Sequence, residues 1–188
     1  MNCKTVFLDR DGIINRKRPE DDYVKSWAEF EFLPKVKEAL ILLKEKKIRI
    51  IITTNQRCVA RGIITEATLQ SIHGQMLAEF GRAGISIDAI YYCPHEKGHC
   101  SCRKPQIGMF LQAKRDFPDI NFTTSTVIGD SLIDMEAGTR LGCRTILIAD
   151  TNIGLSMIEQ ARTKGISVQA TAQSLYDAVI QDFRVRRQ

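Results

Sequence analysis

Pairs of carboxylates stand at two places in the chain where an apolar run has just ended. Asp9 and Asp11 follow the run at 5–8, and Asp130 and Asp134 follow a later one. A polar turn would account for one such pair alone. Carboxylates that share a site repel one another unless a cation neutralises them, and hard oxygen ligands suit Mg²⁺, which also bridges to phosphate groups. One carboxylate can attack phosphorus to form an acyl phosphate, and another, two residues on, can protonate the leaving oxygen and later activate water.

A lysine and a hydroxyl group complete this set. Lys104 and the Thr54 hydroxyl can stabilise charge on the oxygens of a phosphoryl group. Uncatalysed hydrolysis of phosphate monoesters needs up to ~10²¹-fold acceleration, which a single base does not supply. We therefore expect a nucleophile, an acid, a metal ion and a lysine to act together at one site.

Four soft ligands lie within ten residues of one another: Cys93, His95, Cys100 and Cys102. A Cys₃His set of this kind is typical of structural zinc, because all four tetrahedral positions are filled by protein. A disulfide between the last two cysteines would need strained geometry. His99 is a rival ligand, but its position directly beside a cysteine ligand is awkward. The spacing predicts a structural zinc ion.

The expected zinc loop ends immediately before Arg103 and Lys104. A metal-clamped loop would hold this basic pair rigidly and so prepare it to bind phosphate. The remaining cysteines, Cys3, Cys58 and Cys143, read as ordinary core or loop residues.

Alternating apolar runs and helical periodicities indicate which elements position these groups. Short runs rich in Val, Ile and Thr predict buried parallel strands at 5–8, 48–53, 87–92, 126–129 and 144–148. Apolar residues at helical spacing predict helices near 36–43, 69–80 (after an N-cap at Thr65), 107–116, 132–141, 155–163 and 173–183. This alternation predicts the α/β class, with a doubly wound parallel sheet covered by helices on both faces.

No repeat or linker divides the chain, so we expect one domain over 1–188. The polar segment 9–34 predicts a loop or small hairpin and is too short for a separate cap domain. In an open parallel sheet, ligands bind beyond the carboxyl ends of the strands, so the polar clusters should meet in one crevice there.

The bulk composition narrows the possible partners. The 188 residues are 44% hydrophobic and 26% charged, which excludes a disordered chain, and the net charge of +5 favours anionic substrates. No stretch combines dense Lys and Arg with aromatics, so we expect no nucleic-acid partner. No run is long enough to span a membrane and no secretory signal is evident, which predicts a cytoplasmic location.

The carboxylate, threonine and lysine motifs together resemble those of the haloacid dehalogenase (HAD) superfamily. They are Asp9-x-Asp11, Thr54, Lys104 and Gly129-Asp130-x-x-x-Asp134. The resemblance implies a Rossmann-like fold with Asp9 as the nucleophile and Asp11 as the general acid/base. It also implies Mg²⁺ held by Asp9, the Asp11 carbonyl and Asp130, with Asp134 in support. Ile13 stands where the first motif usually has Thr or Val.

Further motifs resemble one branch, the D-glycero-D-manno-heptose-1,7-bisphosphate 7-phosphatases, which act in the synthesis of heptose precursors of surface glycans. They are Asp-x-Asp-Gly-x-Ile-Asn at 9–15, Tyr23-Val24, Thr54-Asn55-Gln56, Tyr92-Cys93-Pro94-His95 and Cys102-Arg103-Lys104-Pro105. The resemblance implies catalytic roles for Asp9, Asp11, Thr54, Arg103 and Lys104, and substrate contacts from Tyr23, Thr54, Asn55, Gln56, Arg57, Arg103, Lys104 and Ser131. Arg57-Cys58 replaces the usual Ser-Gly, and Ser131 stands where Lys is frequent.

Other functions remain open at this point. A histidinol-phosphate phosphatase shares the zinc loop, and the acidic segment Glu20-Asp21-Asp22 would suit the amine of its substrate. A DNA 3′-end phosphatase module shares the carboxylate motifs, although the zinc loop and the lack of a nucleic-acid tract count against it. A non-catalytic phosphate-binding protein would not need the full set of catalytic side chains. We expect a monomer, and the sequence does not decide between the α and β anomers of the heptose.

Overall fold

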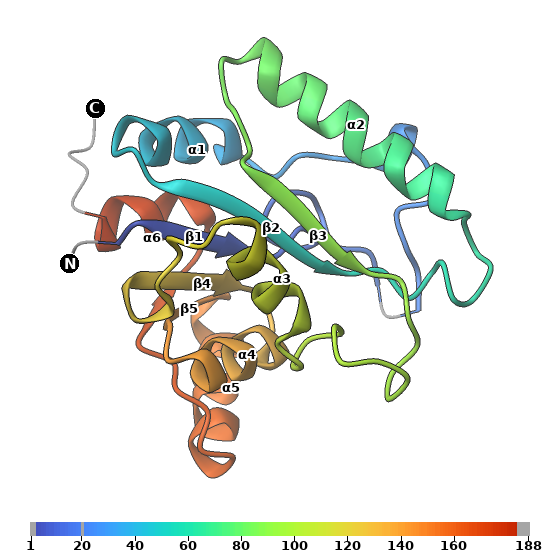
Figure 1. The fold of residues 1–188 in the computed structure, drawn as a ribbon. Helices are drawn as coiled ribbons and strands as arrows, with labels where there is room; N and C mark the ends of the chain where they lie inside the picture. The colour runs from blue at the N-terminus through green and yellow to red at the C-terminus, as the bar shows by residue number, and fades with distance from the viewer. Residues whose placement is uncertain (1–2, 20, 184–188) are drawn as a thin grey trace.

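Six parallel strands form one sheet in the computed structural model, which describes residues 3–19 and 21–183 (Figure 1). The strands are β1 (Thr5–Leu8), β2 (Arg49–Asn55), β3 (Ala89–Cys93), β4 (Ser125–Gly129), β5 (Arg144–Ile148) and β6 (Ala170–Ala172). Their order across the sheet is β3-β2-β1-β4-β5-β6. This is the order of a doubly wound Rossmann-like sheet, and it confirms the predicted fold class.

Helices cover both faces of this sheet. They are α1 (Val36–Glu45), α2 (Glu66–Arg82), α3 (Gly108–Asp116), α4 (Leu132–Leu141), α5 (Thr151–Thr163) and α6 (Leu175–Asp182), with short 3₁₀ turns η1 (Trp27–Glu29) and η2 (Phe122–Thr124). In Figure 1, α1, α2 and α6 lie on one side of the sheet and α3, α4 and α5 on the other. The predicted N-cap Thr65 accepts a hydrogen bond from the Thr68 N–H at 3.1 Å and begins α2.

The central strands are buried on both faces, which explains their almost continuous apolar sequences. In β1, Val6 and Leu8 join the core under α1, α2 and α6, whereas Phe7 points to the core under α3 and α4. The same alternation continues in the neighbouring strands, since successive side chains of a strand point to opposite faces. Leu77, an apolar residue within the helix predicted near 69–80, is 38% exposed on α2.

The sheet brings the ends of β1, β2 and β4 to one edge. Leu8 pairs with Ile52 of β2 on one side and with Ile128 of β4 on the other, so the residues after β1 and β4 emerge side by side. The strand order reverses between β1 and β4, which is where open α/β sheets form their ligand crevice. β2 runs further than predicted and ends at Asn55, so Thr54 belongs to the strand itself.

The segment after β1 folds back over this edge, and its described residues form no helix or strand beyond η1. Isolated bridges join Asn15 to Asp11 and to Phe32, and the Leu33 N–H donates to the Ile14 carbonyl at 3.0 Å. These contacts agree with the expected loop. None of the helices within 3–19 and 21–183 is long and apolar enough to cross a membrane.

Candidate active site

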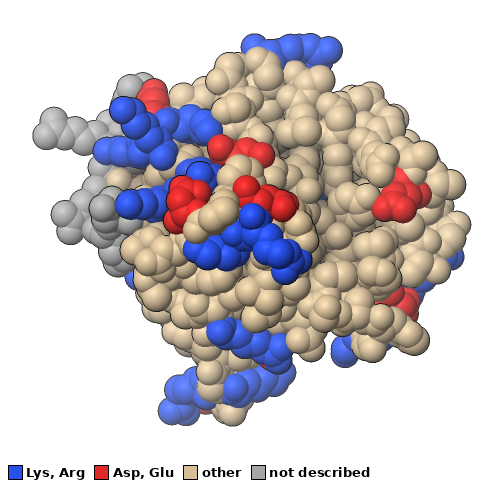
Figure 2. All heavy atoms as spheres, in the orientation of Figure 1, with Lys and Arg blue, Asp and Glu red and all other residues tan. Residues whose placement is uncertain are grey.

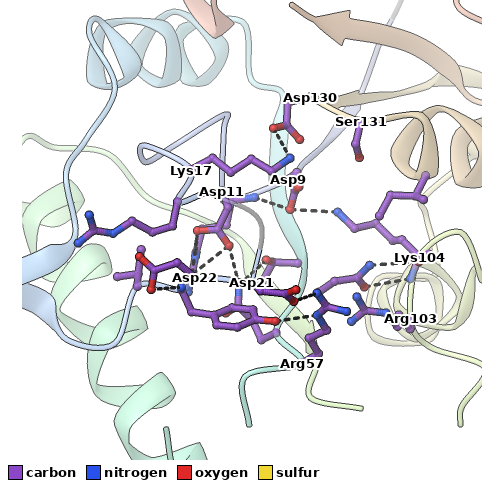
Figure 3. Close-up of a pocket in the computed structure, with 18 of the residues that line it drawn as sticks. Asp9, Asp11, Lys17, Asp21, Asp22, Arg57, Arg103, Lys104, Asp130 and Ser131 are labelled. Atoms are coloured by element: carbon purple, nitrogen blue, oxygen red, sulfur yellow. Dashed lines mark hydrogen bonds and ion pairs between the residues drawn. The ribbon is translucent and has the colours of Figure 1, made fainter. Parts of the chain in front are cut away.

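A crevice of about 420 Å³ opens at the carboxyl edge of the sheet (Figure 3). The predicted site residues that line it are Asp9, Asp11, Tyr23, Thr54, Asn55, Gln56, Arg57, Arg103, Lys104, Asp130 and Ser131. Asp134, the remaining predicted carboxylate, is 1% exposed and binds Lys104 from α4. Residues from five different segments of the chain therefore meet at the topological switch point of the sheet.

Lys104 is the centre of the buried ionic contacts. Its Nζ lies 3.0 Å from Asp9 Oδ1, 2.6 Å from Asp134 Oδ1 and 2.7 Å from the Thr53 carbonyl oxygen. Burial alone would lower the pKa of this ammonium group, but the two carboxylates outweigh burial and raise it. Lys104 is therefore a fixed positive charge beside the Asp9 carboxylate.

Asp9 lies in a setting that disfavours its charge. Burial, which outweighs the attraction of Lys104, together with the carboxylates of Asp134 and Asp130, raises the pKa of Asp9 to about 7 in the metal-free chain. A cation next to Asp9 would remove this repulsion and keep it ionised.

Asp11 lies in the opposite electrostatic setting. Its carboxylate accepts hydrogen bonds from Arg10 Nη2 at 2.9 Å, from Asn15 Nδ2 at 2.9 Å and from Gln56 Nε2 at 2.8 Å. Burial would raise the pKa of Asp11, but Arg10 and these donors lower it. Two carboxylates separated by one residue thus have pKa values shifted in opposite directions, raised for Asp9 and lowered for Asp11.

Asp130 provides an oxygen with the character of a metal ligand. Its Oδ1 atom is buried and has no hydrogen-bond partner among the described residues, while Oδ2 accepts from Lys17 Nζ at 2.7 Å. Asp9, Asp130 and Asp134 can each place an oxygen within 4.8 Å of the others. Gly12, at φ +86°, leaves room for Asp130, since a Cβ there would lie 2.2 Å from Asp130 Oδ2. A hard cation such as Mg²⁺ fits this unsatisfied carboxylate cluster.

The Cys₃His set converges as a compact group. Cys102 Sγ lies 3.1 Å from Cys93 Sγ and 3.3 Å from Cys100 Sγ, and His95 Nδ1 lies 3.3 Å from Cys102 Sγ. All four ligand atoms lie within 4.8 Å of one another, which fits one tetrahedral zinc ion. The rival ligand His99 does not belong to this group.

The zinc loop is tied directly to the catalytic edge. Cys93 is the last residue of β3 and pairs with Asn55, the last residue of β2. The Asn55 side chain donates to the Lys104 carbonyl at 3.1 Å and accepts from the Lys104 N–H at 3.0 Å. The Arg103 N–H donates to Cys100 Sγ at 3.3 Å. The loop that gathers the four ligands therefore also positions the Arg103-Lys104 backbone.

Four charged side chains beside the crevice, two arginines and two acids, are joined by ion pairs into a closed outer ring. Arg57 donates to the Tyr23 hydroxyl at 2.7 Å and to Asp21 at 2.6 Å. Arg61 also binds Asp21, at 2.8 Å, and binds Glu96 of the zinc loop at 2.9 Å. The ring joins the segment after β1 to the zinc loop.

Three residues near the carboxylates were not predicted from the sequence: Arg10, Lys17 and His73. Arg10 is 1% exposed, and its Nη1 donates to His73 Nε2 on α2 at 3.0 Å. Burial lowers the pKa of His73 to about 3, so the ring is neutral and can accept this bond. The position of Arg10 between two aspartates is a local sequence signal for an ion pair. No sequence motif points to His73 or Lys17 as a site residue.

The charge pattern on the outside is mixed. On the face drawn in Figure 2, Lys and Arg side chains form several separate groups with Asp and Glu among them. The described residues on this face form no continuous basic tract of the kind that tracks a nucleic-acid backbone.

Comparisons with known proteins place this geometry among phosphatases. A family model described as polynucleotide kinase 3 phosphatase matches residues 4–142. A D-glycero-alpha-D-manno-heptose-1,7-bisphosphate 7-phosphatase of Campylobacter jejuni is 39% identical over 80% of this chain and 84% of its own. A D-glycero-beta-D-manno-heptose-1,7-bisphosphate 7-phosphatase of Photorhabdus laumondii is 40% identical over 76% of this chain and 79% of its own.

A solved structure has nearly the same fold. The D,D-heptose 1,7-bisphosphate phosphatase from B. bronchiseptica, complexed with magnesium and phosphate, has a TM-score of 0.84 and 32% identity, covering 96% of this chain and 98% of its own.

Proposed function

Since this chain belongs to the D-glycero-D-manno-heptose-1,7-bisphosphate 7-phosphatases of the HAD superfamily, we propose that it removes the 7-phosphate of that bisphosphate through an aspartyl-phosphate on Asp9. One observation carries the mechanism: the Asp9 carboxylate lies in the crevice at the carboxyl edge of the sheet, with its Oδ1 3.0 Å from the buried ammonium group of Lys104. A second cationic group, Arg103, lines the same crevice and can hold the phosphate that is not cleaved.

Each side chain has a distinct part in the proposed reaction. Asp9 attacks the phosphorus atom and the bond to the sugar oxygen breaks. Asp11, which must take up a proton before this step, donates that proton to the leaving oxygen. Asp11 then removes a proton from water, which attacks phosphorus and releases Asp9. Lys104 and the Thr54 hydroxyl stabilise the phosphoryl oxygens throughout.

The carboxylate cluster and the Cys₃His cluster call for different metals. Asp9, the Asp11 carbonyl and Asp130 would hold Mg²⁺, which neutralises the carboxylates and polarises the phosphoryl group when it is bound. The unsatisfied Asp130 Oδ1 supports this assignment. Zinc in the Cys₃His cluster would be structural, because the protein fills all four positions.

The outer ring gives a physical argument against histidinol phosphate. An amine would need free carboxylates at the crevice mouth, but Asp21 already accepts from Arg57 and Arg61, and Asp22 accepts from Lys25 at 2.9 Å. Glu20, the other residue of that acidic segment, lies outside the described residues.

A DNA 3′-phosphate is the second candidate substrate, because the matching family model is described as polynucleotide kinase 3 phosphatase. The mixed charge around the crevice favours a small bisphosphate instead. The single domain, the monomeric state and the cytoplasmic location remain predictions. Relatives named for both the alpha and the beta heptose support either anomer.

A screen of phosphate release tests the substrate. We expect the highest kcat/KM on heptose 1,7-bisphosphate, at least tenfold above that on histidinol phosphate and on a 3′-phosphorylated oligonucleotide. A preference for either rival substrate would replace the proposal.

A further inference from the structure

The segment after β1 adds a cation to the carboxylate cluster that the proposed mechanism does not use. Lys17 Nζ lies 2.7 Å from Asp130 Oδ2, and Lys17 lines the crevice. Figure 3 shows its side chain extended towards Asp130, next to Asp9. The lysine is half exposed, whereas its partner carboxylate is 15% exposed. This differs from the pair between Lys25 and Asp22, in which both side chains are at least 40% exposed.

Lys17 changes the charge balance of the cluster. The other ion pairs bind Arg10 to Asp11, and Lys104 to Asp9 and Asp134. With Lys17 on Asp130, four carboxylates face three cations, and one net negative charge remains. Without Lys17 the cluster would carry two. A divalent cation and a phosphate group must both enter this field, and they respond to the extra positive charge in opposite ways.

We propose that Lys17 is a built-in counter-ion of the cluster that weakens binding of the divalent cation and strengthens binding of the phosphate group. The inference rests on the proposed function, since it presumes that Asp130 holds the metal. Lys17 acts by charge rather than by blocking, because it binds Oδ2 and leaves the buried Oδ1 without a partner.

Coulomb's law sets the expected size of the effect. For a single and a double charge about 6 Å apart in a water-like dielectric, removing the single charge changes the affinity about tenfold. Salt screens part of this interaction, so we expect changes of about three- to tenfold at physiological ionic strength.

The test measures Mn²⁺ binding to the otherwise metal-free full chain, with its zinc retained, by electron paramagnetic resonance. We expect Lys17→Met to lower the Kd for Mn²⁺ by about three- to tenfold. Lys17→Arg keeps the charge and should remain near wild type. Lys44→Met is the matched control, since Lys44 pairs with Asp88 at 3.3 Å, outside the crevice, and its loss should leave the Kd unchanged.

The second readout is the inhibition constant of inorganic phosphate at saturating Mg²⁺. Lys17→Met should raise it by about three- to tenfold, while Lys44→Met should not. The inference is overturned if either shift is missing or reversed; weaker Mn²⁺ binding would mean that Lys17 only orients Asp130. If neither the wild-type protein nor the Asp130→Asn variant binds Mn²⁺, the metal site of the proposed function is wrong as well.

Discussion

At the scale of single residues, Asp9 carries the proposed covalent chemistry. Asp9→Asn keeps the shape of the side chain but removes the nucleophile, so kcat should fall below about 3% of wild type. Circular dichroism should show an unchanged fold, because the amide can still accept a hydrogen bond from Lys104. A purified variant that retains more than this activity would rule out the aspartyl-phosphate.

Arg103 is the residue expected to bind the phosphate that is not cleaved and so to favour a bisphosphate substrate. A guanidinium can bind a phosphate through two parallel hydrogen bonds, whereas Lys104 acts as a point charge at the transferring group. Losing a charge-assisted contact costs about 1.5–3 kcal/mol, so Arg103→Ala should reduce kcat/KM on the bisphosphate by roughly 10- to 150-fold.

The loss on p-nitrophenyl phosphate should be much smaller, because that substrate lacks a second phosphate. Steady-state kinetics on both substrates make the comparison. Equal losses would mean that Arg103 serves the phosphoryl group being transferred.

At the scale of elements, the zinc loop connects the end of β3 to Arg103 and Lys104. Cys100→Ala should lose zinc and reduce activity by about tenfold or more, because Arg103 and Lys104 are then held less precisely. Cys143→Ala is the matched control, since this buried cysteine lies outside the cluster. The zinc content and the kcat/KM of the two variants should be measured. A zinc-free variant with full activity would refute a positioning role for the loop.

Helix α2 contributes through His73, which accepts the hydrogen bond of buried Arg10. His73→Phe removes this acceptor and leaves a buried charged donor partly unsatisfied, which should cost about 1–3 kcal/mol of unfolding free energy. His73→Gln offers a side-chain oxygen and should restore part of the loss. Urea unfolding measures both variants, and an unchanged midpoint for His73→Phe would show that the bond is not needed for stability.

Most elements could be predicted because each has its own periodicity. Strands buried on both faces have continuous apolar sequences, and Thr65 marks the N-cap of the helix that follows it. β6 is not among the predicted strands, because its three residues, Ala170–Ala172, are too few to form a pattern. β2 extends beyond its predicted end, because polar Thr54 and Asn55 resemble a loop in sequence but pair with β3.

At the scale of the whole molecule, the position of the crevice is predictable from the sequence, because parallel strands end at a common edge of the sheet. Lys17 and His73 are not predictable in this way, because their contacts with Asp130 and Arg10 span 113 and 63 positions of the chain. Contacts at such separations arise from the folded topology and have no local signature.

The position of the phosphate that is removed distinguishes the proposed function from the alternatives. The chain should be incubated with D-glycero-D-manno-heptose 1,7-bisphosphate and Mg²⁺, and the product examined by ³¹P nuclear magnetic resonance. We predict that the signal of the primary phosphate at C7 disappears, that inorganic phosphate accumulates in equal amount, and that the glycosidic phosphate at C1 remains. Loss of the C1 phosphate, or no release from this substrate, would contradict the proposed function.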